Sequence, residues 1–140
     1  TLKTKSFKAL KGQLPWPADG RIISKFGRQW NSKLKTTTEN PGIDIKGKPG
    51  SSIRTVLGGV VTTITYIRGY GTTIIVDHGG GFYTVYSHVT NIQTNVDSQV
   101  RNGDVIAYMG DSGSINGSKL HFEIWGKGQK LDPEKWLRKK

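Results

Sequence analysis

The sequence predicts an all-β fold, a two-layer antiparallel β-sandwich followed by one short C-terminal helix. Three observations support this prediction: nineteen glycines in 140 residues, repeated short runs of Val, Ile, Thr and Tyr, and few windows with helical spacing. A chain of this length has the size of one domain. We therefore expect a single β-rich unit.

The clearest predicted strands lie in the middle of the chain. Residues 59–67 are β-branched almost throughout, and Gly69-Tyr70-Gly71 leads into a second run over 72–78. Three glycines at 79–81 then reverse the chain into 82–88. Short runs of this kind joined by glycine turns are typical of an antiparallel meander.

Further elements are expected on both sides of this meander. Additional strands are predicted at 42–45, 100–107 and 119–125. Residues 28–41 are rich in Asn, Lys and Thr and are expected to form an exposed loop. Near the end, Asp132 can cap a short helix, Pro133 suits its first position and Glu134 favours its N-terminal dipole.

The chain divides into a basic leader, residues 1–13, interpreted as the end of a longer upstream region, and a globular domain, residues 14–140. Cysteine is absent, which excludes disulfides, thiolate metal sites and cysteine nucleophiles. No apolar run approaches the ~20 residues of a membrane-spanning helix. Because the chain starts at Thr1, a missing signal peptide says little about the compartment.

The formal net charge of +11 suggests an anionic partner, but its distribution argues against nucleic acid. Much of the charge lies at the two ends, in Lys3, Lys5, Lys8, Lys11, Lys135, Arg138, Lys139 and Lys140. Such terminal runs are usually solvated tails, and the aromatic residues do not interleave with basic ones as a stacking platform requires. We expect no nucleic-acid partner, whereas an acidic protein or a cell-wall polymer stays open.

A hydrolytic zinc site needs about three protein ligands and a base. The histidines available for it are His78, His88 and His121. His78 stands just before a glycine turn and is interpreted as structural. Strand alternation puts Lys119, His121 and Glu123 on one face. His121 therefore lies on a polar face beside a cation, and Asp44, between two isoleucines, would be costly to bury unpaired.

Five motifs follow one another along the chain. They are Gly42-Ile43-Asp44-Ile45, Gly58-Gly59-Val60-Val61, Gly69-Tyr70-Gly71, Tyr86-Ser87-His88-Val89 and Leu120-His121-Phe122-Glu123-Ile124. Together they resemble the LytM/lysostaphin family of zinc endopeptidases, over residues 14–138. The resemblance implies a LytM-type sandwich, related to the duplicated hybrid motif.

Active members of that family carry His-x-x-x-Asp, Tyr-x-His and His-x-His motifs. By this resemblance, Asn40 replaces a zinc-ligand histidine and Lys119 replaces a catalytic histidine. Asp44 and His121 keep ligand positions, and His88 keeps a catalytic position. The resemblance thus implies a degenerate remnant of a metal site at Asn40, Asp44 and His121, and no set of catalytic residues.

The chemistry of the two replacements agrees with loss of zinc. A neutral amide oxygen is a poor zinc donor beside imidazole or carboxylate, and an ammonium repels a divalent cation. We expect no zinc or other cofactor, and we expect Lys119 to form an ion pair with Asp44 instead. His121 is either a hydrogen-bonded partner of Asp44 or a remnant ligand.

The degeneracy, with residues 10–17 and 131–137, resembles the EnvC-type murein hydrolase activators. This implies a non-catalytic domain that binds and activates a cell-wall N-acetylmuramoyl-L-alanine amidase in peptidoglycan remodelling and cell separation, in the periplasm or elsewhere in the envelope. The implied partner-binding groove comprises Asn40, Asp44, Tyr70, His88, Lys119, His121 and Trp125. Each aromatic member also has a simpler interpretation: His88 as a strand histidine, Tyr70 as a turn residue and Trp125 as core.

Two other functions stay open. One is an active zinc endopeptidase that cuts peptidoglycan cross-bridges, with Asn40 as a weak ligand. The other is a peptidoglycan-binding module, a hypothesis based on the net charge of +11 and the anionic groups of cell-wall polymers. Chelator-sensitive cleavage of cell walls identifies the first, and salt-resistant retention on sacculi identifies the second.

Overall fold

The computed structural model describes residues 6–110 and 117–140. Its large sheet is built from β1 (Arg21–Ser24), β4 (Ile43–Lys46), β6 (Gly59–Ile67), β7 (Gly71–Gly79), β8 (Phe82–Ser87), β10 (Gln99–Val100), β12 (Lys119–Gly126) and β13 (Gln129–Leu131). A smaller sheet contains β5 (Ser52–Arg54), β9 (Val89–Thr90) and β11 (Val105–Met109). A separate hairpin is formed by β2 (Gly27–Asn31) and β3 (Thr36–Asn40).

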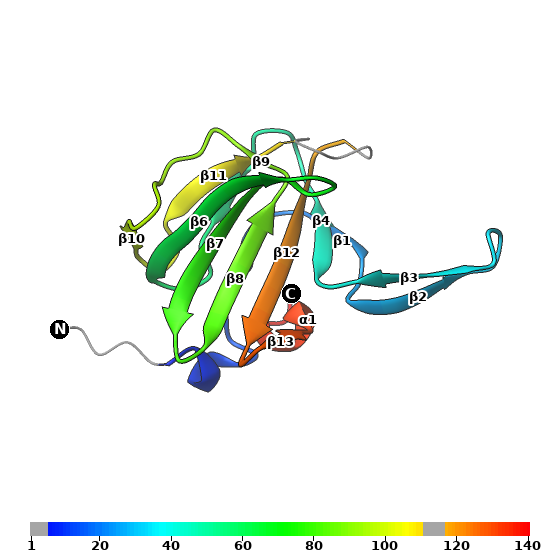
Figure 1. The fold of residues 1–140 in the computed structure, drawn as a ribbon, viewed down its shortest axis with the longest axis horizontal. Coiled ribbons are helices and arrows are strands. Elements are labelled where there is room, and N and C mark those ends of the chain that lie inside the picture. Colours follow the sequence, from blue (N-terminus) through cyan, green and yellow to red (C-terminus); the bar gives the residue numbers. More distant parts are fainter. Residues whose placement is uncertain (1–5, 111–116) are drawn as a thin grey trace.

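The two sheets form two layers (Figure 1). The order in the large sheet is β1-β4-β12-β8-β7-β6-β10, with β13 beside β12, and the order in the small sheet is β5-β11-β9. All these strand pairs are antiparallel. The predicted antiparallel all-β fold is therefore confirmed.

The predicted meander corresponds to β6, β7 and β8. Strand β7 pairs with both of its neighbours, in registers that match Ile74 with Ile64 and with Tyr86. The glycines between β7 and β8 all have left-handed backbone, with φ of 84°, 64° and 84° for Gly79, Gly80 and Gly81. Glycine adopts a positive φ at little energetic cost, so these three residues can reverse the chain from β7 into β8.

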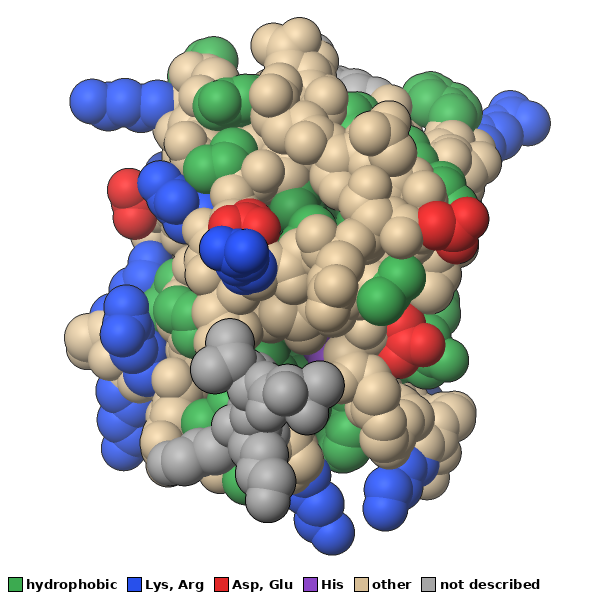
Figure 2. Space-filling model, turned by 90° about the vertical axis from the view of Figure 1, so that its left-hand side faces the viewer, with side chains coloured by type: hydrophobic (Ala, Val, Ile, Leu, Met, Phe, Trp, Pro, Cys, Tyr) green, Lys and Arg blue, Asp and Glu red, His purple; other side chains and the backbone are tan. Residues whose placement is uncertain are grey.

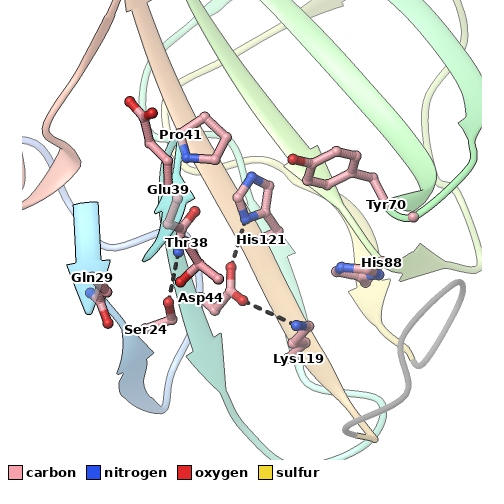
Figure 3. Close-up of a pocket in the computed structure, with 12 residues that line it drawn as sticks. Ser24, Gln29, Thr38, Glu39, Pro41, Asp44, Tyr70, His88, Lys119 and His121 are labelled. Carbon is pink, nitrogen blue, oxygen red and sulfur yellow. Dashed lines mark hydrogen bonds and ion pairs between the residues drawn. The ribbon is translucent and has the colours of Figure 1, made fainter. Parts of the chain in front are cut away.

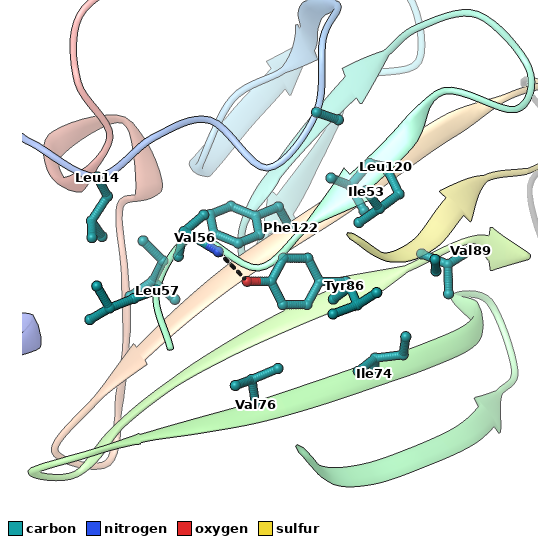
Figure 4. Packing of buried hydrophobic residues seen from close by; sticks show 14 of the residues in the cluster. Leu14, Ile53, Val56, Leu57, Ile74, Val76, Tyr86, Val89, Leu120 and Phe122 are labelled. Atoms are coloured by element: carbon teal, nitrogen blue, oxygen red, sulfur yellow. Dashed lines mark hydrogen bonds between the residues drawn. The ribbon is translucent and has the colours of Figure 1, made fainter. Parts of the chain in front are cut away.

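The core lies between the two layers and contains the ring of Tyr86 (Figure 4). Its hydroxyl oxygen accepts hydrogen bonds from the Val56 amide at 3.1 Å and from the Thr84 hydroxyl at 2.8 Å. The ring packs beside Phe122, with 5.3 Å between centroids. Because its polar atom is satisfied, the fully buried tyrosine costs the core little.

Two expectations about the elements were wrong. Residues 28–41 do not form a loop, since β2 and β3 pair from Gly27 with Asn40 to Asn31 with Thr36. This hairpin projects from the body (Figure 1) and buries almost nothing. Residues 100–107 do not form one strand, because a turn separates β10 from β11, with Gly103 at a φ of 78°.

The predicted terminal helix is confirmed as α1 (Pro133–Trp136), and the Asp132 carboxylate accepts the Glu134 amide at 3.0 Å. The division of the chain at residue 14 stays a prediction, and residues 1–5 of the leader lie outside the described residues. The rest of the leader packs on the domain through the 3₁₀-helix η1 (Phe7–Leu10). Phe7 is 2% exposed and stacks on Phe82 at 5.0 Å.

No helix in the described part of the chain is long and apolar enough to cross a membrane. On the face shown in Figure 2, Lys and Arg side chains lie mainly along the margins and do not gather into one patch. On this face the positive charge is therefore spread out.

We predict that Phe7→Ala lowers the free energy of unfolding by about 3 kcal/mol, because it leaves a cavity beside Phe82 and Trp136. Urea denaturation followed by circular dichroism measures the change. Lys8→Ala at the exposed neighbouring position is the control. A loss below about 1 kcal/mol for Phe7→Ala would show that this segment contributes little to the fold.

Candidate functional site

A cleft of about 370 Å³ lies over β4 and the start of β12, between the β2–β3 hairpin and the turn from β6 to β7 (Figure 3). It is lined by Ser24, Gln29, Thr38, Glu39, Asn40, Pro41, Asp44, Gly69, Tyr70, His88, Lys119 and His121. Of the seven residues that the sequence assigns to a partner-binding groove, the structure brings six together here. The seventh, Trp125, lies elsewhere.

Asp44 connects two strands at the centre of the cleft. Its carboxylate accepts a hydrogen bond from the Lys119 ammonium at 3.0 Å and another from the His121 ring at 2.6 Å (Figure 3). The geometry follows from the antiparallel register, which places Asp44 opposite His121 and Lys46 opposite Lys119. The predicted Asp44–Lys119 ion pair is confirmed, and His121 is a bonded partner of Asp44.

His121 is held between two carboxylates. Its Nδ1 lies 2.6 Å from Asp44 and its Nε2 lies 2.7 Å from Glu123. An ionised carboxylate only accepts hydrogen bonds, so when Asp44 and Glu123 are both ionised, both ring nitrogens donate and the ring is an imidazolium. Burial alone would lower the pKa of His121, but the bonds and charges of Asp44 and Glu123 outweigh it and raise the pKa above 6.5.

The pKa values of the two acids, Asp44 and Glu123, shift in the opposite direction, downward. Burial acts to raise the pKa of Asp44, yet its contacts with His121 and Lys119 bring that pKa below 3.8. Burial likewise acts to raise the pKa of Glu123, and hydrogen bonds from His121 and Trp125 bring it below 4.5. Lys119, Asp44, His121 and Glu123 thus form a chain of alternating charge in which two cations balance two anions.

Asn40 ends β3 and uses its amide within the protein. The carbonyl oxygen accepts the Gly42 amide at 3.0 Å, which makes a local turn, and the NH₂ group donates to the Ser24 hydroxyl at 2.9 Å. Gly42 is packed so tightly that an added Cβ would lie 2.2 Å from the Phe122 carbonyl oxygen. The side chain of Asn40 therefore fixes the path of the chain into β4.

Tyr70 and His88 form the opposite wall (Figure 3). The Tyr70 ring lies 4.9 Å from the ring of His121 and 6.4 Å from that of His88. Burial, and then the charges of Glu123 and Asp44, raise the pKa of Tyr70 above 10.0. His88 is buried with a left-handed backbone, φ 65°, and its amide donates to the Tyr70 carbonyl at 2.9 Å.

Trp125 shares its strand face with His121 but lies four residues further along β12. Its ring lines a separate depression with Tyr83, 6.4 Å away. The indole nitrogen donates to Glu123 at 2.7 Å, so Trp125 is connected to the cleft only through that acid.

The residues of the cleft do not fit a zinc ion. The oxygen of Asn40 is occupied by Gly42, and both nitrogens of His121 are occupied by carboxylates. The Lys119 ammonium lies beside Asp44, the remaining ligand-type residue, and its positive charge repels a metal cation there. Within residues 6–110 and 117–140, no group of three His, Cys, Asp or Glu side chains is arranged to hold a metal ion.

Sequence reasoning placed Glu123 on the face of His121 but left it out of the site, and it missed the hairpin residues of the cleft. Glu123 is 5% exposed and bonds both His121 and Trp125. Its position two residues after His121 was the available signal, because residues two apart share a strand face. Gln29 and Thr38 were missed because their segment was expected to be a loop, whereas β2–β3 pairing places them directly opposite each other.

His78 provides an internal contrast to His121. Its Nδ1 lies 2.9 Å from the Gly58 carbonyl and its Nε2 lies 2.7 Å from the Thr84 hydroxyl, in agreement with the structural role expected for it. Burial lowers its pKa below 6.5, although the Gly58 carbonyl and Asp77 oppose the shift.

We predict that NMR titration places the midpoint of His121 above pH 6.5 and that of His78 below it. A pKa raised by folding stabilises the protein fully below the unfolded value. The contribution of His121 is therefore present below pH 6.5 and is lost as the pH rises through the raised value. His121→Gln removes this loss from the pH dependence of the free energy of unfolding. A midpoint at or below 6.5 for His121 would contradict the imidazolium assignment.

Comparison with known proteins agrees with this geometry. Residues 38–133 match the model of peptidase family M23. Murein hydrolase activator EnvC of Escherichia coli is 32% identical over 135 residues, which cover 96% of this chain and 31% of EnvC. DD-carboxypeptidase/endopeptidase Mpg of Neisseria meningitidis is 33% identical over 113 residues, which cover 81% of this chain and 26% of Mpg.

The fold is also found among solved structures. A zinc-containing peptidase from Vibrio cholerae superposes with a TM-score of 0.81 at 22% identity, over 92% of this chain and 41% of that protein. The chain spans less than a third of the length of the curated relatives described above. The match over residues 38–133, with these relatives, shows that the chain belongs to peptidase family M23.

Proposed function

We propose that this chain is a non-catalytic domain that binds and activates a cell-wall N-acetylmuramoyl-L-alanine amidase during peptidoglycan remodelling and cell separation. One observation carries the proposal: the side chains at the implied metal positions, Asn40, Asp44 and His121, are all engaged in hydrogen bonds within the protein. A cleft that retains its shape without a metal-activated water is suited to binding a protein segment.

The groove in this proposal comprises Asn40, Asp44, Tyr70, His88, Lys119 and His121. Lys119 and Asp44 each have 13% of their side chains exposed, so both can be reached from the cleft. An ammonium has three donors, and Asp44 takes one of them. A helix or loop of the amidase with a carboxylate at this point would gain a charge-assisted hydrogen bond beside the Tyr70 ring.

The relatives support the same proposal. EnvC is named for activation of murein hydrolases and is similar over nearly the whole of this chain. Murein is the cell-wall polymer, so we place the protein in the periplasm or elsewhere in the envelope. A second candidate is an active endopeptidase, because Mpg bears that activity in its name. Incubation of cell walls with and without chelator separates the two, since chelator-sensitive release of peptides identifies the enzyme.

We predict that Lys119→Glu abolishes amidase activation. The new carboxylate lies beside Asp44 and repels an acidic partner group, which costs tenfold or more in affinity, on the order of 1.4 kcal/mol or greater. Amidase binding by calorimetry and release of dye from labelled sacculi measure the effect.

Two further variants make this result interpretable. Lys135→Glu reverses a charge on α1, no residue of which lines the cleft, and is expected to activate normally. Lys119→Met removes the ammonium but keeps an apolar stem of similar length, so it weakens binding without adding a second acid. If a folded Lys119→Glu protein activates the amidase as well as the native chain, the cleft is not the partner-binding surface.

We predict that the double variant Asn40→His/Lys119→His binds zinc with micromolar or tighter affinity, whereas the native chain does not. The variant removes the ammonium from Asp44 and adds two imidazoles to the cleft. Metal analysis after dialysis, followed by competition with a chromogenic chelator, measures both proteins. Stoichiometric zinc in the native protein would contradict the non-catalytic assignment.

A further inference from the structure

A second depression, of about 240 Å³, lies on the same face of the large sheet at the other end of β12. It is lined by Gly81, Tyr83, Trp125, Gly128, Gln129 and Lys130. We call it the aromatic depression. The registers of β12 with β8 and with β13 place Tyr83 and Lys130 directly opposite Trp125, one on each side. Two aromatic rings and an ammonium therefore stand in a row across three adjacent strands.

The orientation of the Trp125 ring is fixed by a hydrogen bond to Glu123. Its indole nitrogen donates to the Glu123 carboxylate at 2.7 Å, and the Lys130 ammonium lies 3.9 Å from the same oxygen. Trp125 is half-buried, and its plane makes an angle of 55° with the ring of Tyr83 at 6.4 Å. Because its polar atom is already satisfied, the part of the indole that faces the depression is an apolar surface held in place.

Two glycine turns form part of the rim of the depression. Gly81, between β7 and β8, has a φ of 84°, and Gly128, between β12 and β13, has a φ of 81°. The two turns are joined by a hydrogen bond of 2.9 Å from the Lys127 amide to the Gly81 carbonyl. Because neither glycine has a side chain, these two positions do not obstruct the approach of a flat ligand to the ring.

From these features we propose that the aromatic depression binds a pyranose ring of an acidic polysaccharide. The face of a pyranose that carries axial C–H groups is flat and apolar and stacks on an indole, while its edge carries hydroxyl and amide groups. The Gln129 amide and the Lys130 ammonium, whose side chain is 54% exposed, stand where they can bind these polar groups and a carboxylate. Lys130 also disfavours a cationic ligand.

The position of the aromatic depression relative to the cleft defines the kind of polymer. His121 and Trp125 are four residues apart on one strand, which corresponds to about 13 Å. A polymer with a saccharide backbone and peptide branches can therefore contact both places along one face. Saccharide binding here is separate from the proposed amidase binding, because it uses Tyr83, Trp125 and Lys130, which do not line the cleft.

The test is titration of the ¹⁵N-labelled chain with the disaccharide of N-acetylglucosamine and N-acetylmuramic acid, followed through the indole N–H signals. We expect the Trp125 signal to shift. Trp125→Ala and Tyr83→Ala should each weaken binding by about tenfold or more, on the order of 1.4 kcal/mol. Lys130→Gln should weaken the binding of the acidic disaccharide more than the binding of neutral chitobiose. Tyr66→Ala removes an exposed tyrosine on β6, outside the depression, and should not change the affinity.

Several results would overturn the proposal. They are the absence of any shift at millimolar disaccharide, equal binding by a folded Trp125→Ala protein, and a Trp125 shift produced by a proline-rich peptide but not by either saccharide. Thermal melts of every variant identify loss of folding, and Tyr83→Ala tests the depression without altering the Trp125–Glu123 bond. Saccharide binding is measured without amidase and amidase binding without saccharide, so failure of one proposal is distinguishable from failure of the other.

Discussion

The rest of the cleft depends on a buried imidazole held between two carboxylates. Because both nitrogens of His121 face acids at 2.6 and 2.7 Å, the ring is charged, and both Asp44 and Glu123 are ionised. Lys119 then balances the charge that remains on Asp44. Loss of any one member leaves another buried charge without its partner, which is far more costly than loss of an exposed pair. These residues form a network of alternating charges.

The antiparallel sheet explains why these four side chains meet. Strand alternation turns Lys119, His121 and Glu123 outward while Leu120 and Phe122 enter the core, where both are fully buried. A shift of the β4–β12 register by one residue would reverse these faces and expose the core residues, so the hydrophobic core itself fixes the positions of the charges. The registers of the sheet therefore position the central side chains of the cleft.

The sequence was informative wherever burial imposes a pattern. β-Branched runs and glycine turns predicted the meander, and a lysine at position 119, where the family resemblance implies a catalytic histidine, predicted the ion pair with Asp44. The β2–β3 hairpin escaped prediction because it buries no face: Trp30 is 64% exposed, so no alternation distinguishes these strands from a polar loop. Periodicity placed Trp125 on the correct face, but it could not say which of two hollows along β12 the ring enters.

Because the network is neutral, long-range electrostatic attraction of a partner and its specific recognition in the cleft depend on different groups. The chain carries a formal charge of +11, yet within the network Lys119 and charged His121 are balanced by Asp44 and Glu123. The net positive charge that remains lies outside this network, and it can raise the rate of encounter with an anionic partner or polymer in a manner that salt screens. Selection among partners must then come from the shape of the cleft and from its fixed hydrogen-bonding groups, which salt screens little.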